Sequence, residues 1–316
     1  MPSFGLPASK IPFADKLVGQ IVHFGSLWEI QAGLQRSVMR DNYVVGTIFH
    51  GIRGDASFEN ALAKIVQQQD QFLKLHTAST IMEERFKAWG ISPDKIVNIP
   101  LGVDLQTFHP SSEEARRAAR ERLGIPQNVF VVGSFHKDGV GSQEGLEPKL
   151  IKGPDVLLEV VSKLKGKMPV FVYLTAPARG YVIEGLRKLG IPYRHDVFED
   201  YHAVAKSYAA LDAYLVASRE EGGPSGVLEA QASGVPLVST RVGLAPDLVQ
   251  HAHNGLLAEV EDSAGLTEHL LALAQDQALS QRLTSNALES IQAYGWPRIA
   301  ARYYHEIYKP ILDEVS

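Results

Sequence analysis

The sequence of 316 residues contains no cysteine. This absence excludes disulfide bonds, thiolate metal sites and cysteine nucleophiles, and it is typical of proteins in a reducing compartment. Eleven histidines are present, but none belongs to a His-Glu-x-x-His pattern, which would indicate a zinc protease. Catalytic and ligand-binding groups in this chain are therefore expected to be oxygen- and nitrogen-containing groups.

Long apolar runs and an excess of positive charge are also missing. No run approaches the ~18 apolar residues of a membrane-spanning helix, and the N-terminal stretch MPSFGLPASKIPFADK lacks the apolar core of a signal peptide. With 31 basic and 36 acidic residues, the formal net charge is −5, so nucleic acid is not expected as a partner. These absences predict a cytoplasmic protein, and they leave contact with the inner face of a membrane open.

Short apolar runs alternate with amphipathic stretches of helical length along the whole chain. This alternation predicts parallel strands joined by right-handed helical crossovers, and hence an α/β fold. A first series of expected strands covers Leu17–Phe24, Tyr43–His50, Phe72–His76 and Ile96–Pro100. A second series covers Val129–Gly133, Val170–Thr175, Ala213–Ala217, Val235–Thr240 and Gly255–Val260. Two parallel-sheet domains are therefore predicted.

The stretch LGVDLQTFHP, residues 101–110, separates the two series. A helix is expected directly after it, because Ser111 and Glu114 have the spacing of a capping box. The last residues form an aromatic-rich helix that is expected to pack back on the first domain. The predicted domains are residues 1–105 with helix 296–316, and residues 106–295.

The segment SREEGGPSGVLEA, residues 218–230, connects an expected buried strand to an expected helix. Gly223, Pro224, Ser225 and Gly226 begin that helix, where free backbone N–H groups and a partial positive charge of about half a unit favour a phosphate. Glu221 and Glu229 would flank the phosphate and accept hydrogen bonds from hydroxyl groups, as a sugar nucleotide requires. A plain loop-to-helix junction, with acidic residues that complement the helix dipole, would show the same local pattern.

Several further motifs, which follow one another in the expected order along the chain, support the interpretation of this segment as a sugar-nucleotide site. The stretch SREEGGPSGVLEAQASGVPLVSTRVG resembles the E-x7-E region of retaining GT-B glycosyltransferases of family 4. KIVNIPLGVDLQTFHP resembles the interdomain stretch of that family, and VGLAPDLVQHAHNGLLAEVED resembles its next conserved segment. The resemblance implies two Rossmann-like domains that face a cleft, with transfer of a sugar from a UDP-, GDP- or ADP-sugar to an acceptor hydroxyl.

The resemblance also implies roles for individual residues around the leaving diphosphate. Lys152 matches the lysine of the family's Lys-Gly pair, and Ser134 stands where an arginine is often found. Because this arginine is missing, Lys137 is the first candidate for the second cation beside the diphosphate, and Lys149 is the alternative candidate. Glu221 would hold a hydroxyl of the donor sugar, and Glu229 would hold the ribose.

The remaining assignments concern the base and the acceptor side. Val197 and Phe198 lie in the loop that would read the base, and His50 matches a histidine that faces the donor sugar. No Asp-x-Asp pair occurs in the sequence, so neither a metal-bridged diphosphate nor any other metal site is expected. No cofactor besides the donor substrate is expected.

The main departure from the family is the first domain, which is shorter than usual and has no Gly-x-Gly loop before His50. Such a domain exposes a sheet edge, and homodimerisation or peripheral membrane docking would cover it. Two other functions stay open: a non-catalytic sugar-nucleotide-binding or partner subunit, and a nucleotide-sugar epimerase or phosphorylase on the same fold. A dinucleotide-dependent oxidoreductase is disfavoured, because no Gly-x-Gly-x-x-Gly follows a first strand.

Overall fold

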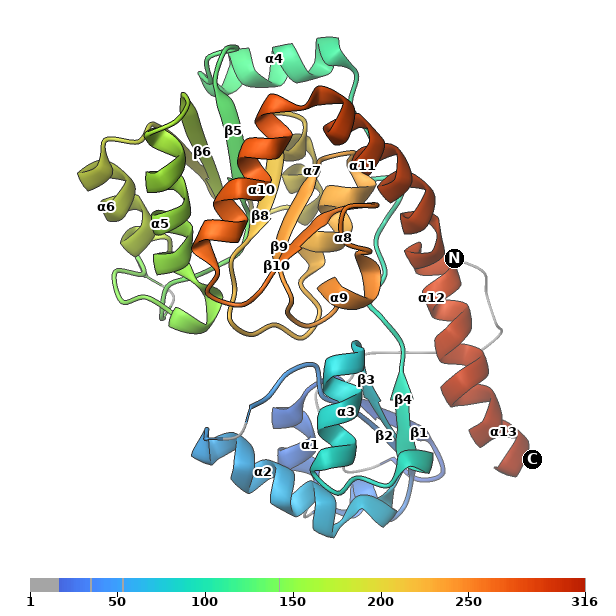
Figure 1. Ribbon diagram of the computed structural model, residues 1–316. Coiled ribbons are helices and arrows are strands. Elements are labelled where there is room, and N and C mark those ends of the chain that lie inside the picture. Colours follow the sequence, from blue (N-terminus) through green and yellow to red (C-terminus); the bar gives the residue numbers. More distant parts are fainter. Residues whose placement is uncertain (1–16, 35, 53, 142, 316) are drawn as a thin grey trace. The chain divides into compact units, whose positions relative to one another are not determined.

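The chain folds into two compact units, one built from residues 1–102 and 296–316 and one from residues 103–295. A computed structural model (Figure 1) describes residues 17–34, 36–52, 54–141 and 143–315. Residues 1–16, on which the expectation about a signal peptide rests, lie outside the described residues. In the described part of the chain, no helix combines the length and the apolar character that a membrane span requires.

The first unit contains a parallel sheet with the strand order β1-β2-β3-β4. Its strands are β1 (Ile21–Phe24), β2 (Tyr43–Thr47), β3 (Phe72–Thr77) and β4 (Ile96–Asn98). Its helices are α1 (Leu27–Gly33), α2 (Ala56–Gln67), α3 (Thr80–Ala88), α12 (Trp296–Tyr303) and α13 (Lys309–Val315). A π-helical turn, Tyr304–Tyr308, joins the last two helices.

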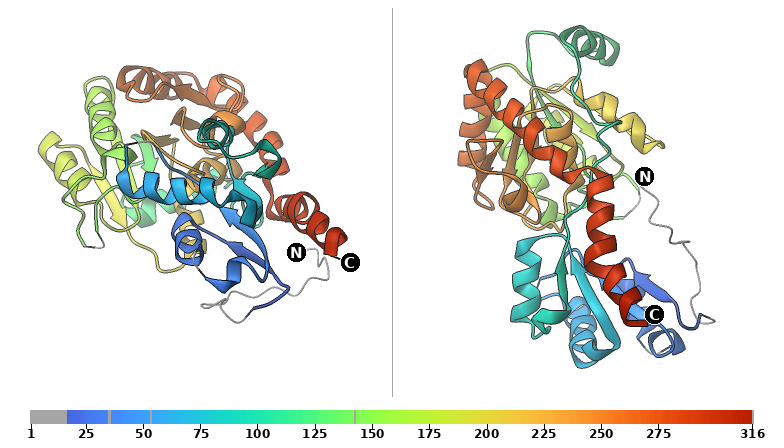
Figure 2. Two further views of the ribbon diagram at one scale, coloured as in Figure 1. Left: turned by 90° about the horizontal axis from the view of Figure 1, so that it is seen from below. Right: turned by 90° about the vertical axis from the view of Figure 1, so that its right-hand side faces the viewer.

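Neighbouring residues of a strand point to opposite faces of this sheet, and each face has its own apolar core. Val44 belongs to the core under α1, α2 and α3. Val45 belongs to a second core that contains Ile299 of α12, Ile307 of the π turn and Ile311 of α13. The C-terminal helices therefore form the second outer layer of the first unit, and Figure 2 shows them beside its sheet.

The second unit contains a six-stranded parallel sheet with the order β10-β9-β8-β5-β6-β7. Its strands are β5 (Phe130–Ser134), β6 (Val170–Thr175), β7 (Tyr193–Asp196), β8 (Ala213–Val216), β9 (Leu237–Thr240) and β10 (Leu256–Ala258). Its helices are α4 (Glu113–Leu123), α5 (Pro154–Lys165), α6 (Gly180–Leu189), α7 (Tyr201–Tyr208), α8 (Ser225–Ala232), α9 (Ala245–Leu248), α10 (Ser263–Gln275) and α11 (Gln277–Ser290).

The strand order of this sheet reverses between β5 and β8. From β5 the chain moves outward through β6 to β7, then returns to β8 and moves outward in the other direction to β10. Helices α5, α6 and α10 share one apolar core with the sheet. In open α/β sheets, ligands bind at such a point of reversal, at the carboxyl ends of the strands, which here are those of β5 and β8.

The predicted order of strands and helices matches the structure, with corrections at particular elements. The helix cap is Ser112 rather than Ser111, because the Ser112 side chain accepts from the backbone N–H of Ala115 at 3.1 Å. The strand β7 and the helices α9 and α11 were not predicted, and α1 was expected only as a crossover helix without bounds. Asp55, which the sequence places after His50, caps α2 by accepting from the N–H groups of Ser57 and Phe58.

Candidate functional site

The loops that follow β5 and β8 meet at the reversal point of the six-stranded sheet. Ser134 is the last residue of β5 and is buried, and Ser218 follows β8 by two residues and is also buried. Gly153 precedes α5 with a φ of +63°, and a Cβ there would clash with the carbonyl oxygen of Ala217. A glycine is therefore required for the backbone before α5 to approach the end of β8.

This close approach places Lys152 beside Glu221. The Lys152 Nζ lies 2.6 Å from the Glu221 Oε2, and the Ser218 hydroxyl donates to the other carboxylate oxygen at 2.9 Å. Both charged side chains are mostly buried. Two residues that the sequence assigns separately, one to the diphosphate and one to the donor sugar, thus form one ion pair.

Backbone contacts fix the geometry of this pair. The N–H groups of Arg219 and Glu220 both donate to the carbonyl oxygen of Ile151, at 2.8 and 3.1 Å. The Arg219 guanidinium forms two 2.8 Å hydrogen bonds with Asp155 in the first turn of α5. The loop after β8 is therefore tied to the start of α5, and the Lys152–Glu221 pair belongs to a rigid junction.

Glu229 lies in the second turn of α8, and its side chain is buried against aromatic rings. Its carboxylate accepts from the Tyr201 hydroxyl at 2.5 Å and from the Tyr208 hydroxyl at 2.7 Å. Burial, with the nearby Glu229 charge second, raises the pKa of both tyrosines above the usual range. Both phenols therefore stay protonated and act as hydrogen-bond donors to the carboxylate.

The beginning of α8 has the open character that the sequence predicts. Pro224 is the N-cap and gives no side-chain hydrogen bond to the first turn, and the exposed Ser225 follows it. A glycine is needed at Gly226 for a reason other than the predicted approach of a ligand. A Cβ at this position would clash with the buried Tyr214 hydroxyl. Its small size therefore lets α8 pack on β8, while Gly223 lies in the loop before the cap.

A buried ion pair that the sequence did not reveal lies beneath Ser134. Arg179, which precedes α6, is fully buried, and one of its guanidinium nitrogens lies 3.0 Å from a carboxylate oxygen of the buried Asp138. The same guanidinium donates to the Ser134 carbonyl oxygen at 2.6 Å and to the Ser134 hydroxyl at 3.2 Å. Burial raises the pKa of Asp138, and Arg179 acts in the opposite direction. An arginine thus contacts Ser134, the position where the resemblance implies one, from the connection between β6 and α6.

The segment around Arg179 holds the long loop after β5. Gly180 N–H donates to the Glu144 carbonyl at 2.7 Å, and Tyr181 N–H donates to the Gly145 carbonyl at 3.0 Å, so this loop caps the start of α6. Ala178 has a φ of +59°, a conformation that is strained for alanine. The loop that begins with Lys137 is therefore anchored by backbone hydrogen bonds.

The other predicted residues lie at the surface. Lys137 is exposed in the loop after β5, Val197 is exposed directly after β7, and Phe198 beside it is half-buried. His50 is exposed three residues beyond the end of β2 in the first unit. Their predicted roles stay predictions.

His136, in the loop after β5, lies near two positively charged side chains. Burial lowers the pKa of this histidine to about 3, and the charges of Arg179 and Lys152 act in the same direction. His136 is therefore a neutral imidazole at physiological pH. Among the described residues, no group of three or more His, Asp and Glu side chains could hold a metal ion.

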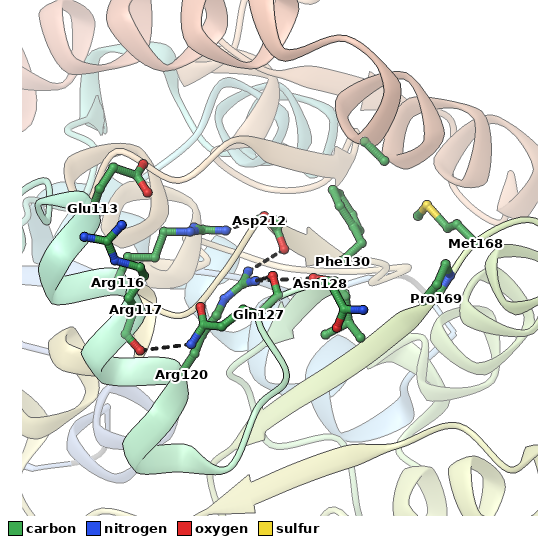
Figure 3. Close-up of a pocket in the computed structure, with 12 residues that line it drawn as sticks. Glu113, Arg116, Arg117, Arg120, Gln127, Asn128, Phe130, Met168, Pro169 and Asp212 are labelled. Carbon is green, nitrogen blue, oxygen red and sulfur yellow. Dashed lines mark hydrogen bonds and ion pairs between the residues drawn. The ribbon is translucent and has the colours of Figure 1, made fainter.

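A cavity of about 510 Å³ lies elsewhere, and Figure 3 shows its lining residues. Phe130 begins β5, Pro169 precedes β6 and Asp212 precedes β8, so the cavity lies at the amino ends of these strands. Arg116 and Arg120 of α4 line it, and both form ion pairs with Asp212. Because these charges are used to dock α4, the carboxyl ends of β5 and β8 remain the candidate site.

Residues 145–290, which include Lys152, Glu221 and Glu229, match the family model described as glycosyl transferases group 1. This segment is therefore similar to the glycosyl transferases group 1 family. The group 1 segment covers most of the second unit, including β8, Glu221 and Glu229, and it begins after β5. The match agrees with the glycosyltransferase resemblance predicted from the motifs, over residues 145–290.

Curated relatives of this chain include a D-inositol 3-phosphate glycosyltransferase from Xylanimonas cellulosilytica. The two sequences are 31% identical over 232 residues, which is 69% of this chain and 52% of the relative. A relative of the same name from Streptomyces bingchenggensis is 28% identical and is covered to 49%. The chain thus spans about half the length of the curated relatives it matches.

Solved structures show the same fold. HepE of Anabaena, in a crystal structure with UDP, superposes with a TM-score of 0.78 at 20% identity, covering 92% of this chain and 79% of that chain. The sucrose-phosphate synthase of Thermosynechococcus elongatus superposes with a TM-score of 0.77 at 19% identity, covering 93% and 74%. The two parallel-sheet units of this chain are therefore those of a GT-B fold, as predicted.

Proposed function

We propose that this chain is a retaining glycosyltransferase that moves a sugar from a nucleoside-diphosphate sugar to an acceptor hydroxyl without a metal ion. The observation that carries the proposal is the Lys152–Glu221 pair at the reversal point of the six-stranded sheet. It places a lysine and a carboxylate side by side at the edge of the sheet where phosphate-containing ligands bind in such folds. The curated names of the relatives support sugar transfer as the reaction.

The site residues have distinct roles in this proposal. The diphosphate docks at the amino end of α8, where Ser225 and Gly226 offer backbone N–H groups, and Lys152 and Lys137 neutralise its charge. Glu221 accepts from a hydroxyl of the donor sugar, and Glu229 accepts from the ribose. Val197 and Phe198 lie beside the base, and His50 belongs to the acceptor side by the resemblance alone.

The transfer forms one bond and breaks one bond at the anomeric carbon. The acceptor oxygen bonds to this carbon, and the bond to the leaving diphosphate oxygen breaks. That diphosphate oxygen takes the acceptor proton. Neither glutamate is free to attack the anomeric carbon as a nucleophile, because Glu221 is paired with Lys152 and Glu229 is held by two tyrosines. Positive charge at Lys152 stabilises the departing diphosphate, which explains how the site works without a metal.

A thermal-shift panel of UDP, GDP, ADP and their sugars tests the donor site. A nucleotide at 100 times its Kd is expected to stabilise the protein by about 2.7 kcal/mol. Glu229→Gln is expected to weaken that response, whereas Glu221→Gln is expected to keep nucleotide binding and lose transfer. Failure of every nucleotide to stabilise the parent protein at millimolar concentration would refute the donor site.

Product analysis with a labelled donor separates the proposal from its alternatives. The proposed enzyme yields an acceptor glycoside with the anomeric configuration of the donor, and D-inositol 3-phosphate is one acceptor to include, given the names of the relatives. An epimerase would return a changed sugar nucleotide, and a phosphorylase would need phosphate. A non-catalytic subunit would bind the nucleotide and turn over nothing; the coverage of about half of each curated relative keeps this alternative open.

Homodimerisation and peripheral membrane contact through the first unit remain separate predictions. The sheet of that unit ends in β1 and β4, which are edge strands. Light scattering and liposome sedimentation test both forms. A monomer that stays in the supernatant would refute them and leave the donor site untouched.

A further inference from the structure

The carboxylate of Glu229 already has a hydroxyl partner on each oxygen. Tyr201 donates to Oε1 and Tyr208 donates to Oε2, and the whole Glu229 residue is only 4% exposed. A buried carboxylate must be hydrogen-bonded, because an unpaired buried charge carries a large desolvation cost. Any ligand hydroxyl that reaches Glu229 must therefore replace one of these two donors.

The two tyrosines differ in how firmly they are held. Tyr208 is 1% exposed, and its ring contacts Phe135 at 4.9 Å and Tyr214 at 5.5 Å between centroids. Tyr201 is 53% exposed and is the first residue of α7, with its ring against Phe108 at 5.6 Å. Tyr208 is thus part of the core, whereas the Tyr201 side chain is half exposed and lies at the edge of the core, where it covers one side of the buried Phe108.

The backbone under Tyr201 is anchored independently of its hydroxyl. The Asp200 side chain accepts from the N–H of His202 at 3.0 Å and caps α7. The His202 ring lies 3.1 Å from the hydroxyl of Thr107. The first turn of α7 therefore stays in place when the phenol turns away, so that the movement is limited to one side chain.

We propose that the Tyr201 hydroxyl holds Glu229 in the ligand-free protein and is displaced by a ribose hydroxyl of the bound nucleotide. This inference rests on the proposed function, because it takes the ligand to be a nucleoside diphosphate. Binding then exchanges one O–H donor on the carboxylate for another. Tyr201 is a competitor for the ribose site, and it lowers the affinity of the nucleotide by the strength of its own hydrogen bond.

The exchange treats nucleotides with and without ribose hydroxyls differently. A nucleotide with 2′ and 3′ hydroxyls replaces the donor that it displaces. A 2′,3′-dideoxynucleotide cannot do so, and it binds with Tyr201 still on Glu229. Because Tyr201 keeps Glu229 paired in that complex, it lowers the discrimination against a ligand that lacks the hydroxyl, and removing the Tyr201 hydroxyl is expected to raise it.

The test compares Tyr201→Phe with Tyr208→Phe, because both variants remove one hydroxyl from the same carboxylate. Isothermal titration measures the Kd of UDP, GDP and ADP for each protein, and the Kd of the 2′,3′-dideoxy form of whichever binds. Tyr201→Phe is expected to bind the ribonucleotide about tenfold more tightly, given the typical strength of a hydrogen bond to a charged group. Its affinity for the dideoxynucleotide is expected to stay at the parental value.

The control variant is expected to behave differently. Tyr208→Phe removes a donor that the ligand does not replace, so its ribonucleotide affinity stays equal or falls. Both variants are expected to lower the Tm of the ligand-free protein, which verifies that each hydroxyl was bonded to Glu229. A Tyr201→Phe protein that binds the ribonucleotide with unchanged or weaker affinity overturns the inference alone. A parent protein that binds none of the three nucleotides overturns the proposed function, and the inference with it.

Discussion

Lys152 and Glu221 neutralise each other in the ligand-free site, with 2.6 Å between Nζ and Oε2. In the proposed reaction, a diphosphate that binds there adds negative charge on the Lys152 side, so the lysine would be shared between the carboxylate and the ligand. As the reaction proceeds, charge grows on the diphosphate and the lysine interaction strengthens. Interactions that strengthen in the transition state are those that raise the rate.

Lys152→Ala is therefore expected to lower the rate of sugar transfer by about 10²- to 10³-fold, the usual loss when one stabilising group of a developing anion is removed. A radiolabelled transfer assay measures this effect. Lys167→Ala is the matched control, since Lys167 is an exposed lysine in the turn before β6, at the opposite edge of the sheet. A Lys152→Ala enzyme with the parental rate would remove this residue from the proposed mechanism.

Arg179 and Asp138 form a fully buried pair, and the loss of one partner leaves the other as an isolated charge. Arg179→Met is expected to lower the free energy of unfolding by about 3–5 kcal/mol. Urea denaturation followed by circular dichroism measures the change. The double variant Arg179→Met, Asp138→Leu is expected to regain much of this stability. If the single variant were as stable as the parent, the pair would have no structural role.

The sequence revealed some of these residues and not others, for a physical reason. Glu221, Glu229 and Lys152 stand in local motifs, so their place at a strand end follows from the chain itself. Arg179 and Asp138 are charged residues 41 positions apart in sequence number (179 − 138), and charged residues are usually exposed. Only the approach of the loop after β5 to the start of α6 pairs them. For the same reason no local pattern connects Tyr201 to Glu229.

At the scale of elements, the C-terminal helices are joined to the first sheet by a polar network as well as by apolar packing. The two ring nitrogens of His23 lie 2.7 Å from the hydroxyls of Tyr308 and Thr47. Thr47 in turn lies 3.0 Å from a ring nitrogen of the buried His76, and Tyr303 lies 3.0 Å from the other. Both histidines are thus enclosed between the strand ends and the last helices.

This network predicts acid sensitivity of the first unit. Burial lowers the pKa of His23 and His76 from 6.5 to about 4; Glu29 opposes the shift at His23, and Arg302 adds to the shift at His76. The fold binds the neutral imidazoles, so their contribution is present above pH 6.5 and is lost as the pH falls from about 6.5 to 4. The Tm is expected to fall by several degrees across this window.

Thermal melts at several pH values check this expectation. The variant His23→Gln keeps a hydrogen-bonding side chain without an ionisable ring, and it is expected to flatten the dependence. A parent protein with the same Tm at pH 7 and pH 4.5 would contradict the argument.

Periodicity predicted most strands and helices, and the missed elements show its limit. The strand β7 reads Tyr-Arg-His-Asp and lies at the edge of the sheet, so it has no apolar run to reveal it. Helix α11, Gln277–Ser290, fully buries only Leu283 and Ala287, and most of its other residues are polar. Edge elements and surface helices bury little, and the chain therefore carries little pattern for them.

At the scale of the whole molecule, the chain has separate apolar cores in its two units. Two transitions are therefore expected in differential scanning calorimetry. A nucleotide that binds at the carboxyl ends of β5 and β8 contacts the second unit through the group 1 segment, so it is expected to raise the transition of that unit more than the other. A single transition, shifted as a whole, would show that the units unfold together.

The route of the backbone has a consequence for biosynthesis. Residues 103–295 are contiguous, and an isolated parallel bridge joins their two ends, Val103 and Gly295. The first unit instead needs Ile299, Ile307 and Ile311 to cover Val45 and Val97. A ribosome therefore releases the material for the second unit while the first still has one face of its sheet bare. The unit whose strands are translated first is therefore the unit that completes its folding last. Until its C-terminal helices are made, its uncovered valines form an apolar surface that a chaperone can bind.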